Sequence, residues 1–146
     1  MQVLKHTVFM ARTAQQVAEH LAKPYPRHQF GEKRWLCQVY LGQDRRIHYE
    51  VSRPWSRSGR QLEIGLHLES RTKGLNRELL ARLDPYVHQI RAELGQVVYA
   101  EFWDRGWAKV YYSHPDAPLT PDLVSQTAQG LVTFIEVVQP IYQHIR

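Results

Sequence analysis

Alternating apolar and polar residues predict a β-sheet across the first half of the chain and again near residue 100. The most regular alternation lies at residues 61–69, where the apolar side chains from Leu62 to Leu68 occupy every second position. This period of two places them all on one side, which is typical of a strand with one buried face. Less regular alternation predicts further strands at residues 2–10, 35–41, 46–52, 97–103 and 107–113.

Apolar residues spaced three or four apart predict two long helices, at residues 75–94 and 120–145. Thr13, followed three residues later by a glutamine, matches a capping box and predicts a shorter helix that ends before Pro24. Pro85 leaves two alternatives open. Either the 75–94 helix is kinked there, or a second helix starts at this proline.

Strands joined by hairpins, rather than strands that alternate strictly with helices, favour the α+β class. We expect residues 1–146 to form a single domain, with one antiparallel sheet of about five strands and the two long helices packed on one face. A chain of 146 residues with 43% hydrophobic content is long enough to bury a core of its own. The expected core residues are Leu62, Ile64, Leu66, Leu83, Val87, Ile90, Leu131, Phe134 and Val138.

The chain lacks the usual features of an exported protein. No run of about 20 apolar residues occurs, and Lys5 and His6 interrupt the first apolar stretch, so we expect no signal peptide. The single cysteine, Cys37, cannot form an internal disulfide, and its place on an apolar strand face predicts a small core residue. We therefore expect a cytoplasmic protein.

The positive charge of the chain is concentrated in one segment. Residues 27–60 contain eight lysines and arginines against three acidic residues, whereas the rest contains eleven of each, so this segment carries the net charge of +5. A localised positive field attracts anionic partners, whereas scattered surface charge is screened beyond about 10 Å. The charge pattern therefore favours binding of an anionic macromolecule.

Six residues of this segment are the candidate binding residues: Arg45, Arg46, Arg53, Trp55, Arg57 and Arg60. Arginine forks match phosphate oxygens, and an exposed indole stacks on a nucleic-acid base. The alternative is that Trp55 packs onto the sheet edge while the arginines are solvated or neutralise nearby acids. We predict a non-catalytic binding module for an anionic macromolecule, with nucleic acid favoured over protein, and we assign no catalytic residue, metal or cofactor.

Histidines and glutamates share the polar faces of two neighbouring strands. His48 and Glu50 point together, and so do Glu63, His67 and Glu69. Two histidines and a carboxylate can bind a divalent transition metal. One alternative function is therefore a metal-dependent enzyme or nuclease, with its cluster formed by His48, Glu63, His67 and Glu69. Antiparallel sheets ordinarily leave one face in water, however, so we expect these side chains to be exposed and not to bind metal.

A second aromatic group flanks the predicted turn at Asp104–Gly106. Tyr99, Trp103, Trp107 and Tyr111 lie at even spacings along the two strands. Side chains at these spacings share a face, which favours core or dimer packing. A second alternative is therefore a protein-interaction or chaperone-like homodimer with Trp103 and Trp107 near its interface. We expect a homodimer for the binding module as well.

Several segments give the chain a resemblance to known layouts: residues 62–68, Leu75-Asn76, residues 90–95 and residues 134–141. From about Arg46 onward, the layout resembles the bacterial module called domain of unknown function 4268. This resemblance implies a protein connected with restriction or DNA handling, without an assigned activity. The order of elements is also similar to that of type III secretion chaperones, small dimeric proteins that bind extended segments of a partner. Those chaperones are typically acidic, whereas this chain is basic.

Overall fold

The computed structural model describes residues 1–146 and confirms an α+β fold built on one antiparallel sheet. The strands are β1 (Gln29–Phe30), β2 (Cys37–Tyr40), β3 (Ile47–Ser52), β4 (Trp55–Ser56), β5 (Gly59–Leu68), β6 (Tyr99–Asp104) and β7 (Trp107–Pro115). The helices are α1 (His6–Leu21), α2 (Leu75–Leu83), a 3-10 turn at Asp84–Tyr86, α3 (Val87–Leu94) and α4 (Pro121–Ile145).

The sheet has seven strands rather than the five predicted. Its order is β1-β2-β3-β5-β7-β6, with β4 paired to β5 beside this path. The two additional strands, β1 and β4, are each two residues long, too short to give an alternating pattern in the sequence. The five longer strands form within a few residues of their predicted positions.

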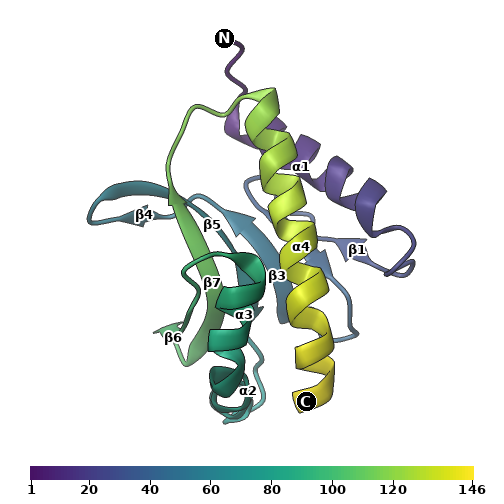
Figure 1. The fold of residues 1–146 in the computed structure, drawn as a ribbon, viewed down its shortest axis with the longest axis vertical. Helices are drawn as coiled ribbons and strands as arrows, with labels where there is room; N and C mark the ends of the chain where they lie inside the picture. Colours follow the sequence, from purple (N-terminus) through teal and green to yellow (C-terminus); the bar gives the residue numbers. More distant parts are fainter.

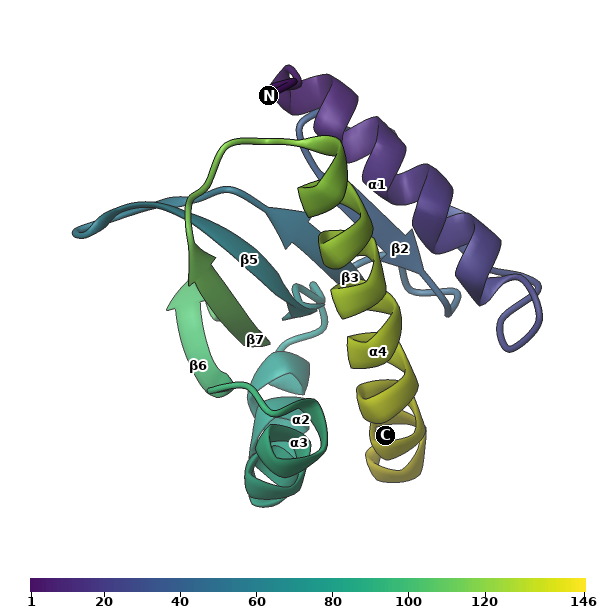
Figure 2. The same cartoon turned by 45° about the horizontal axis from the view of Figure 1, so that its top comes forward.

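The helices cover one face of the sheet (Figures 1 and 2). Helix α4 packs on β3 and β5, α1 packs on α4 and β2, and α2 packs on β7. The hydroxyl of Tyr49 on β3 donates a hydrogen bond of 2.7 Å to Oε1 of Gln139 on α4, which ties the sheet to this helix. Of the predicted core residues, only Val87 is not fully buried. No helix combines the length and the apolar character needed to cross a membrane.

The N-terminal region differs from its prediction. The strand predicted at residues 2–10 is wrong, because α1 already begins at His6. The helix start predicted at Thr13 is also wrong, since its hydroxyl donates to the carbonyl of Phe9 inside the helix. The buried residues of α1, Phe9, Met10, Thr13, Val17 and Leu21, recur at helical spacing. This face packs against α4 and β2, so tertiary contacts determine where the helix lies.

Two turns involve residues that the sequence singles out, Pro85 and Gly106. At Pro85 the predicted long helix is interrupted: a 3-10 turn over Asp84–Tyr86 lies between α2 and α3, and α3 begins at Val87 rather than at the proline. Arg105 and Gly106 form the two-residue turn between β6 and β7, with φ values of 48° and 76°. Two consecutive positive φ values give the tight hairpin that the sequence predicts.

Candidate functional site

The six predicted binding residues do not form one surface. Arg45 and Arg46 precede β3, whereas Arg53, Trp55, Arg57 and Arg60 follow it. A strand of six residues spans about 20 Å, so the two groups lie at opposite ends of the sheet.

The group that follows β3 surrounds the β4–β5 hairpin. Arg53 donates two hydrogen bonds to the carboxylate of Asp116, at 3.0 and 2.7 Å, so its charge is neutralised within the chain. The Nε of Arg60 donates to the carbonyl of Arg53, and its guanidinium lies 5.2 Å from the ring centroid of Trp55. Trp55 itself is 76% exposed, so it does not pack onto the sheet edge. Arg57 is exposed at the hairpin tip.

The group that precedes β3 separates as well. Arg45 donates to Oε1 of Gln29 at 2.8 Å, and its guanidinium stacks on the ring of Tyr40. Arg46 instead lines a cavity at the end of the sheet where α2 begins. Of the six predicted residues, Arg46 is the one that lines this cavity.

We call this hollow the α2 cavity. It has a volume of about 990 Å³ and is lined by Arg46, Ser70, Arg71, Thr72, Lys73, Gly74, Asn76, Arg77, Phe102, Arg105, Gly106 and Trp107. Five of the lining residues are basic and none is acidic. They come from four parts of the chain: the turn before β3, the loop from β5 to α2, the first turn of α2, and the β6–β7 turn.

A buried asparagine holds the walls of the α2 cavity together. The Oδ1 of Asn76 accepts from the backbone N–H of Ser70, and its Nδ2 donates to the carbonyls of Ser70 and Gly106. One side chain therefore fixes the loop from β5 to α2 against the β6–β7 turn. Gly74 precedes α2 with a φ of 80°, a conformation that favours glycine and lets the chain enter the helix beside the cavity.

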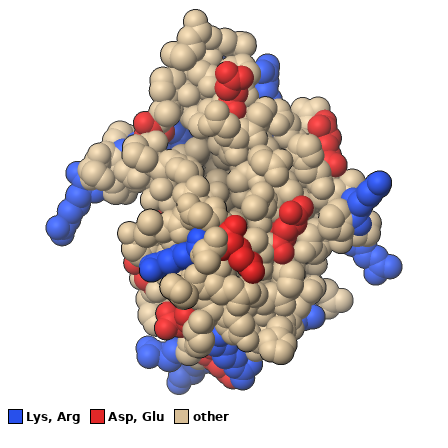
Figure 3. Space-filling view, viewed as in Figure 1, with Lys and Arg blue, Asp and Glu red and all other residues tan.

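Most of the positive charge in the α2 cavity has no partner within the chain. Arg105 lies 3.5 Å from the carboxylate of Asp104, while Arg46, Arg71, Lys73 and Arg77 form no ion pair. Two of the guanidiniums lie over rings of the cavity wall, Arg77 over Phe102 and Arg105 over Trp107. In Figure 3, basic side chains gather at the lower end of the molecule, where α2 lies in Figure 1.

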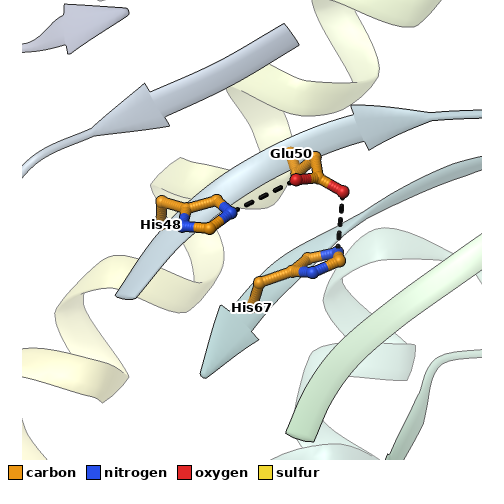
Figure 4. A group of neighbouring side chains, drawn as sticks. All are labelled: His48, Glu50 and His67. Carbon is orange, nitrogen blue, oxygen red and sulfur yellow. Dashed lines mark hydrogen bonds and ion pairs between the residues drawn. The ribbon is translucent and has the colours of Figure 1, made fainter. Parts of the chain in front are cut away.

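A second candidate site lies on the sheet face opposite the helices. His48 and Glu50 on β3 and His67 on β5 point toward one another (Figure 4). The Nε2 atom of His48 lies 3.2 Å from Oε1 of Glu50, and the Nε2 atom of His67 lies 3.4 Å from Oε2. His48 pairs directly with His67 across the strands, and the two rings stack with their centroids 5.5 Å apart. We call these three residues the His–Glu–His cluster.

The prediction that this face is exposed is wrong. His48, Glu50 and His67 are only 5%, 7% and 4% exposed. Larger side chains of the same face pack around them, with the ring of Tyr40 against His48 and that of Trp103 against His67. The burial thus comes from neighbouring strands instead of from a covering helix.

The structure brings together a different set of residues from the predicted metal-binding set. Glu63 forms an ion pair of 2.9 Å with Lys109, away from the imidazoles. Glu69 accepts a hydrogen bond from Nδ1 of His67, on the side of the ring that faces away from His48 and Glu50. Glu50, which the predicted set omits, is the carboxylate that both histidines approach.

The charges within the His–Glu–His cluster reinforce one another. Burial opposes ionisation of Glu50, but the hydrogen-bond contact with His48 and the charges of His67 and His48 outweigh it and lower the pKa of Glu50 to about 2. Burial also disfavours a charged imidazole, yet the hydrogen bond to Glu69 and the charge of Glu50 raise the pKa of His67 above its ordinary value. The cluster is therefore centred on a carboxylate that favours a nearby positive charge.

No family model matches the chain, and no match is found among curated proteins or solved structures. The resemblances to domain of unknown function 4268 and to the type III secretion chaperones therefore stay predictions from layout. The function is therefore inferred from the geometry of the α2 cavity and of the His–Glu–His cluster.

Proposed function

We propose that this protein is a binding module for nucleic acid and that it holds the phosphate backbone in the α2 cavity. The observation that carries the proposal is the convergence of Arg46, Arg71, Lys73, Arg77 and Arg105 on one cavity without an acidic wall residue. Cavities lined by one sign of charge concentrate the electrostatic field and attract ions of the opposite sign. A chain of phosphates is the anion that several spaced guanidiniums match best, because each guanidinium donates a bidentate pair.

The structure of the cavity wall supports this proposal in two further ways. The first turn of α2 contributes Asn76 and Arg77 to the wall, so the positive end of the helix dipole lies at the cavity. The guanidinium carbons of Arg77 and Arg105 lie 5.4 and 5.8 Å from the ring centroids of Phe102 and Trp107, and these cation–π contacts favour positions at the cavity wall before a ligand arrives. A preorganised donor loses less conformational entropy on binding than a freely rotating lysine.

Fluorescence anisotropy with a labelled oligonucleotide tests the proposal. The double variant Arg71→Ala/Lys73→Ala should bind about tenfold or more weakly than the wild type, because two phosphate contacts are lost. The matched control is Lys23→Ala/Arg27→Ala, which removes the same charge from the loop after α1. Both side chains are exposed there, and neither forms an ion pair. This control should bind within about twofold of the wild type, given that it leaves the cavity unchanged.

Two results would contradict the proposal. An equal loss of affinity in both double variants would mean that only the net charge of the protein matters. A larger loss in Arg57→Ala, at the tip of the β4–β5 hairpin, would place the binding surface at the other end of the sheet.

The exposed edge of the sheet favours a second candidate function, a homodimer that presents a shared surface to a protein partner. Strand β6 is the last strand of the sheet, and Tyr99, Phe102 and Trp103 on it are 46%, 46% and 43% exposed. An unpaired edge with exposed aromatic residues is a ready site for strand pairing. Two copies of an antiparallel edge strand can pair around a twofold axis, which gives a closed dimer.

A further inference from the structure

The His–Glu–His cluster contains a buried nitrogen without a hydrogen-bond partner. The Nδ1 atom of His48 lies 3.0 Å from the carbonyl of Arg45, and Nδ1 of His67 lies 2.9 Å from Oε2 of Glu69. Because both partners are acceptors, each Nδ1 carries a proton, and in a neutral imidazole the lone pair of Nε2 then points at Glu50. The Nε2 atom of His67 forms no hydrogen bond there. A buried polar atom of this kind is rare and costs stability unless a ligand satisfies it.

Two lone pairs that face one carboxylate are stabilised by a positive charge between them. Neutral imidazoles alone would place the Nε2 atoms against the negatively charged oxygens of Glu50, at 3.2 and 3.4 Å. A second proton on an imidazole relieves this repulsion, and so does a bound cation. Anchoring of Nδ1 by a carbonyl or a carboxylate is the arrangement that orients metal-binding histidines in proteins.

The spacing of the ligand atoms matches a metal ion. The candidate ligand atoms of His48, Glu50 and His67 all lie within 4.8 Å of one another. Ligands at about 2.0–2.1 Å from a tetrahedral zinc ion lie about 3.3–3.4 Å apart. The Nε2 atom of His48 lies 3.2 Å from Oε1 of Glu50 and that of His67 lies 3.4 Å from Oε2, so each imidazole is at this separation from one oxygen of the carboxylate. Two imidazoles with a carboxylate are a ligand set for divalent transition metals, in contrast to the all-oxygen sets that calcium and magnesium prefer.

The side chain of Gln38 is a candidate fourth ligand beside these three. The Nε2 atom of Gln38 on β2 is 2.9 Å from Oε1 of Glu50 and 3.2 Å from Nε2 of His48. A half-turn of the amide exchanges its nitrogen and oxygen, and Oε1 of Gln38 then takes this position. The hydroxyl of Tyr40, which now donates to that oxygen at 3.1 Å, would instead accept from the amide nitrogen. Gln38 is buried as well, so its amide can close the coordination shell.

We propose that Gln38, His48, Glu50 and His67 bind one divalent transition metal, with zinc as the best match to the ligand set. The site joins three neighbouring strands, β2, β3 and β5. Four protein ligands leave no open position, which is typical of a structural zinc site and not of a catalytic one. The metal would therefore stabilise the sheet and hold the turn before β3, which supplies the carbonyl of Arg45.

Titration of the chelator-treated protein with Co²⁺ tests this proposal, because four-coordinate cobalt gives an intense visible band. The wild type should bind one equivalent. Glu50→Gln and His67→Gln should bind at least about tenfold more weakly, whereas His88→Gln, on the exposed surface of α3, should bind like the wild type. A wild-type affinity no higher than that of Glu50→Gln would overturn the metal site. Full retention of affinity in Gln38→Ala would overturn the four-ligand arrangement.

Thermal unfolding keeps the test decisive even if a variant fails to fold. A ligand that binds only the native state raises its stability in proportion to the logarithm of ligand concentration over Kd. Zn²⁺ should therefore raise the Tm of the wild type and of His88→Gln, while Mg²⁺ should leave both unchanged. The absence of a shift with Zn²⁺ in the wild type would mean that imidazolium protons supply the positive charge of the cluster.

Discussion

Gly65 allows β5 and β7 to approach closely beside the His–Glu–His cluster. It lies on β5 directly opposite Glu50 on β3 and opposite Tyr111 on β7. A Cβ at this position would lie 2.6 Å from Cβ of Tyr111 and 2.7 Å from the carbonyl oxygen of Val110. Both atoms belong to or adjoin the backbone, so they cannot move aside without shifting a strand.

Substitution of this glycine should therefore destabilise the sheet. We expect Gly65→Ala to lower the free energy of unfolding by about 1–3 kcal/mol, the usual cost of excess volume in a packed core. The control is Gly42→Ala, since an added Cβ there meets no atom within 4 Å. Chemical denaturation should find this control within about 0.5 kcal/mol of the wild type. Equal effects of both substitutions would contradict the close strand contact at Gly65.

Cys37 lies in the core rather than at a reactive surface, as the sequence predicts. Burial, with a smaller contribution from Glu50, raises the pKa of its thiol to about 12, so the thiolate is scarce at pH 8. We expect iodoacetamide to label the native protein only as fast as the chain opens, and to label the denatured protein rapidly. Rapid labelling of the native protein at pH 8 would contradict the burial of Cys37.

The pairing of residues in the cluster was partly predictable. A spacing of two indicates which residues of a strand share a face, so His48 with Glu50 and Glu63 with His67 followed from the sequence. The register that places His48 opposite His67 did not, because it depends on how two strands pair. Burial also depends on Tyr40 and Trp103, which come from other strands.

At the scale of elements, α4 organises the packing of the other helices. It contacts α1, α2 and α3 as well as β3 and β5. Its helical spacing was clear from the sequence because its buried face is continuous, from Val124 to Ile141. The spacing of α1 was misread because polar residues interrupt its apolar face, and only contact with α4 and β2 shows which residues are buried.

The position of α4 makes one aromatic residue critical. Phe134 is fully buried, and its ring packs near those of Tyr49 and Tyr112 on the sheet. We expect Phe134→Ala to cost about 3–5 kcal/mol in the free energy of unfolding, measured by chemical denaturation. Gln143→Ala, on an exposed position of the same helix, should cost less than about 0.5 kcal/mol. A loss below about 1 kcal/mol for Phe134→Ala would show that α4 is placed wrongly.

In the whole molecule, the fold gathers basic residues that lie in different segments of the sequence. Residues 27–60 hold the net charge, but Arg53 pairs with Asp116 and Arg45 bonds to Gln29. The α2 cavity takes four of its five basic residues from outside this segment. Outside residues 27–60 the sequence contains as many acidic residues as basic ones, so counting the net charge of each segment did not identify these four residues.

Strand β6 forms an unpaired edge of the sheet, from which we predict that the protein is a dimer. If β6 pairs with its counterpart in a second copy, sedimentation should find a dimer at both low and high salt, because burial of aromatic surface drives it. Trp103→Lys should favour the monomer, since an edge lysine opposes strand pairing. Val8→Lys, at an exposed position of α1, is the control. A wild type that is monomeric at both salt concentrations would exclude this dimer.

The salt dependence of oligonucleotide affinity shows whether the α2 cavity binds nucleic acid. The logarithm of the binding constant falls with the logarithm of salt concentration by about 0.9 for each duplex phosphate contacted. If all the basic residues of the cavity contact phosphates, the wild-type slope should be about −4 to −4.5. Arg71→Ala/Lys73→Ala should flatten this slope by about 2, and Lys23→Ala/Arg27→Ala should leave it unchanged. An unchanged slope in the cavity variant, or equal flattening in both variants, would contradict the account.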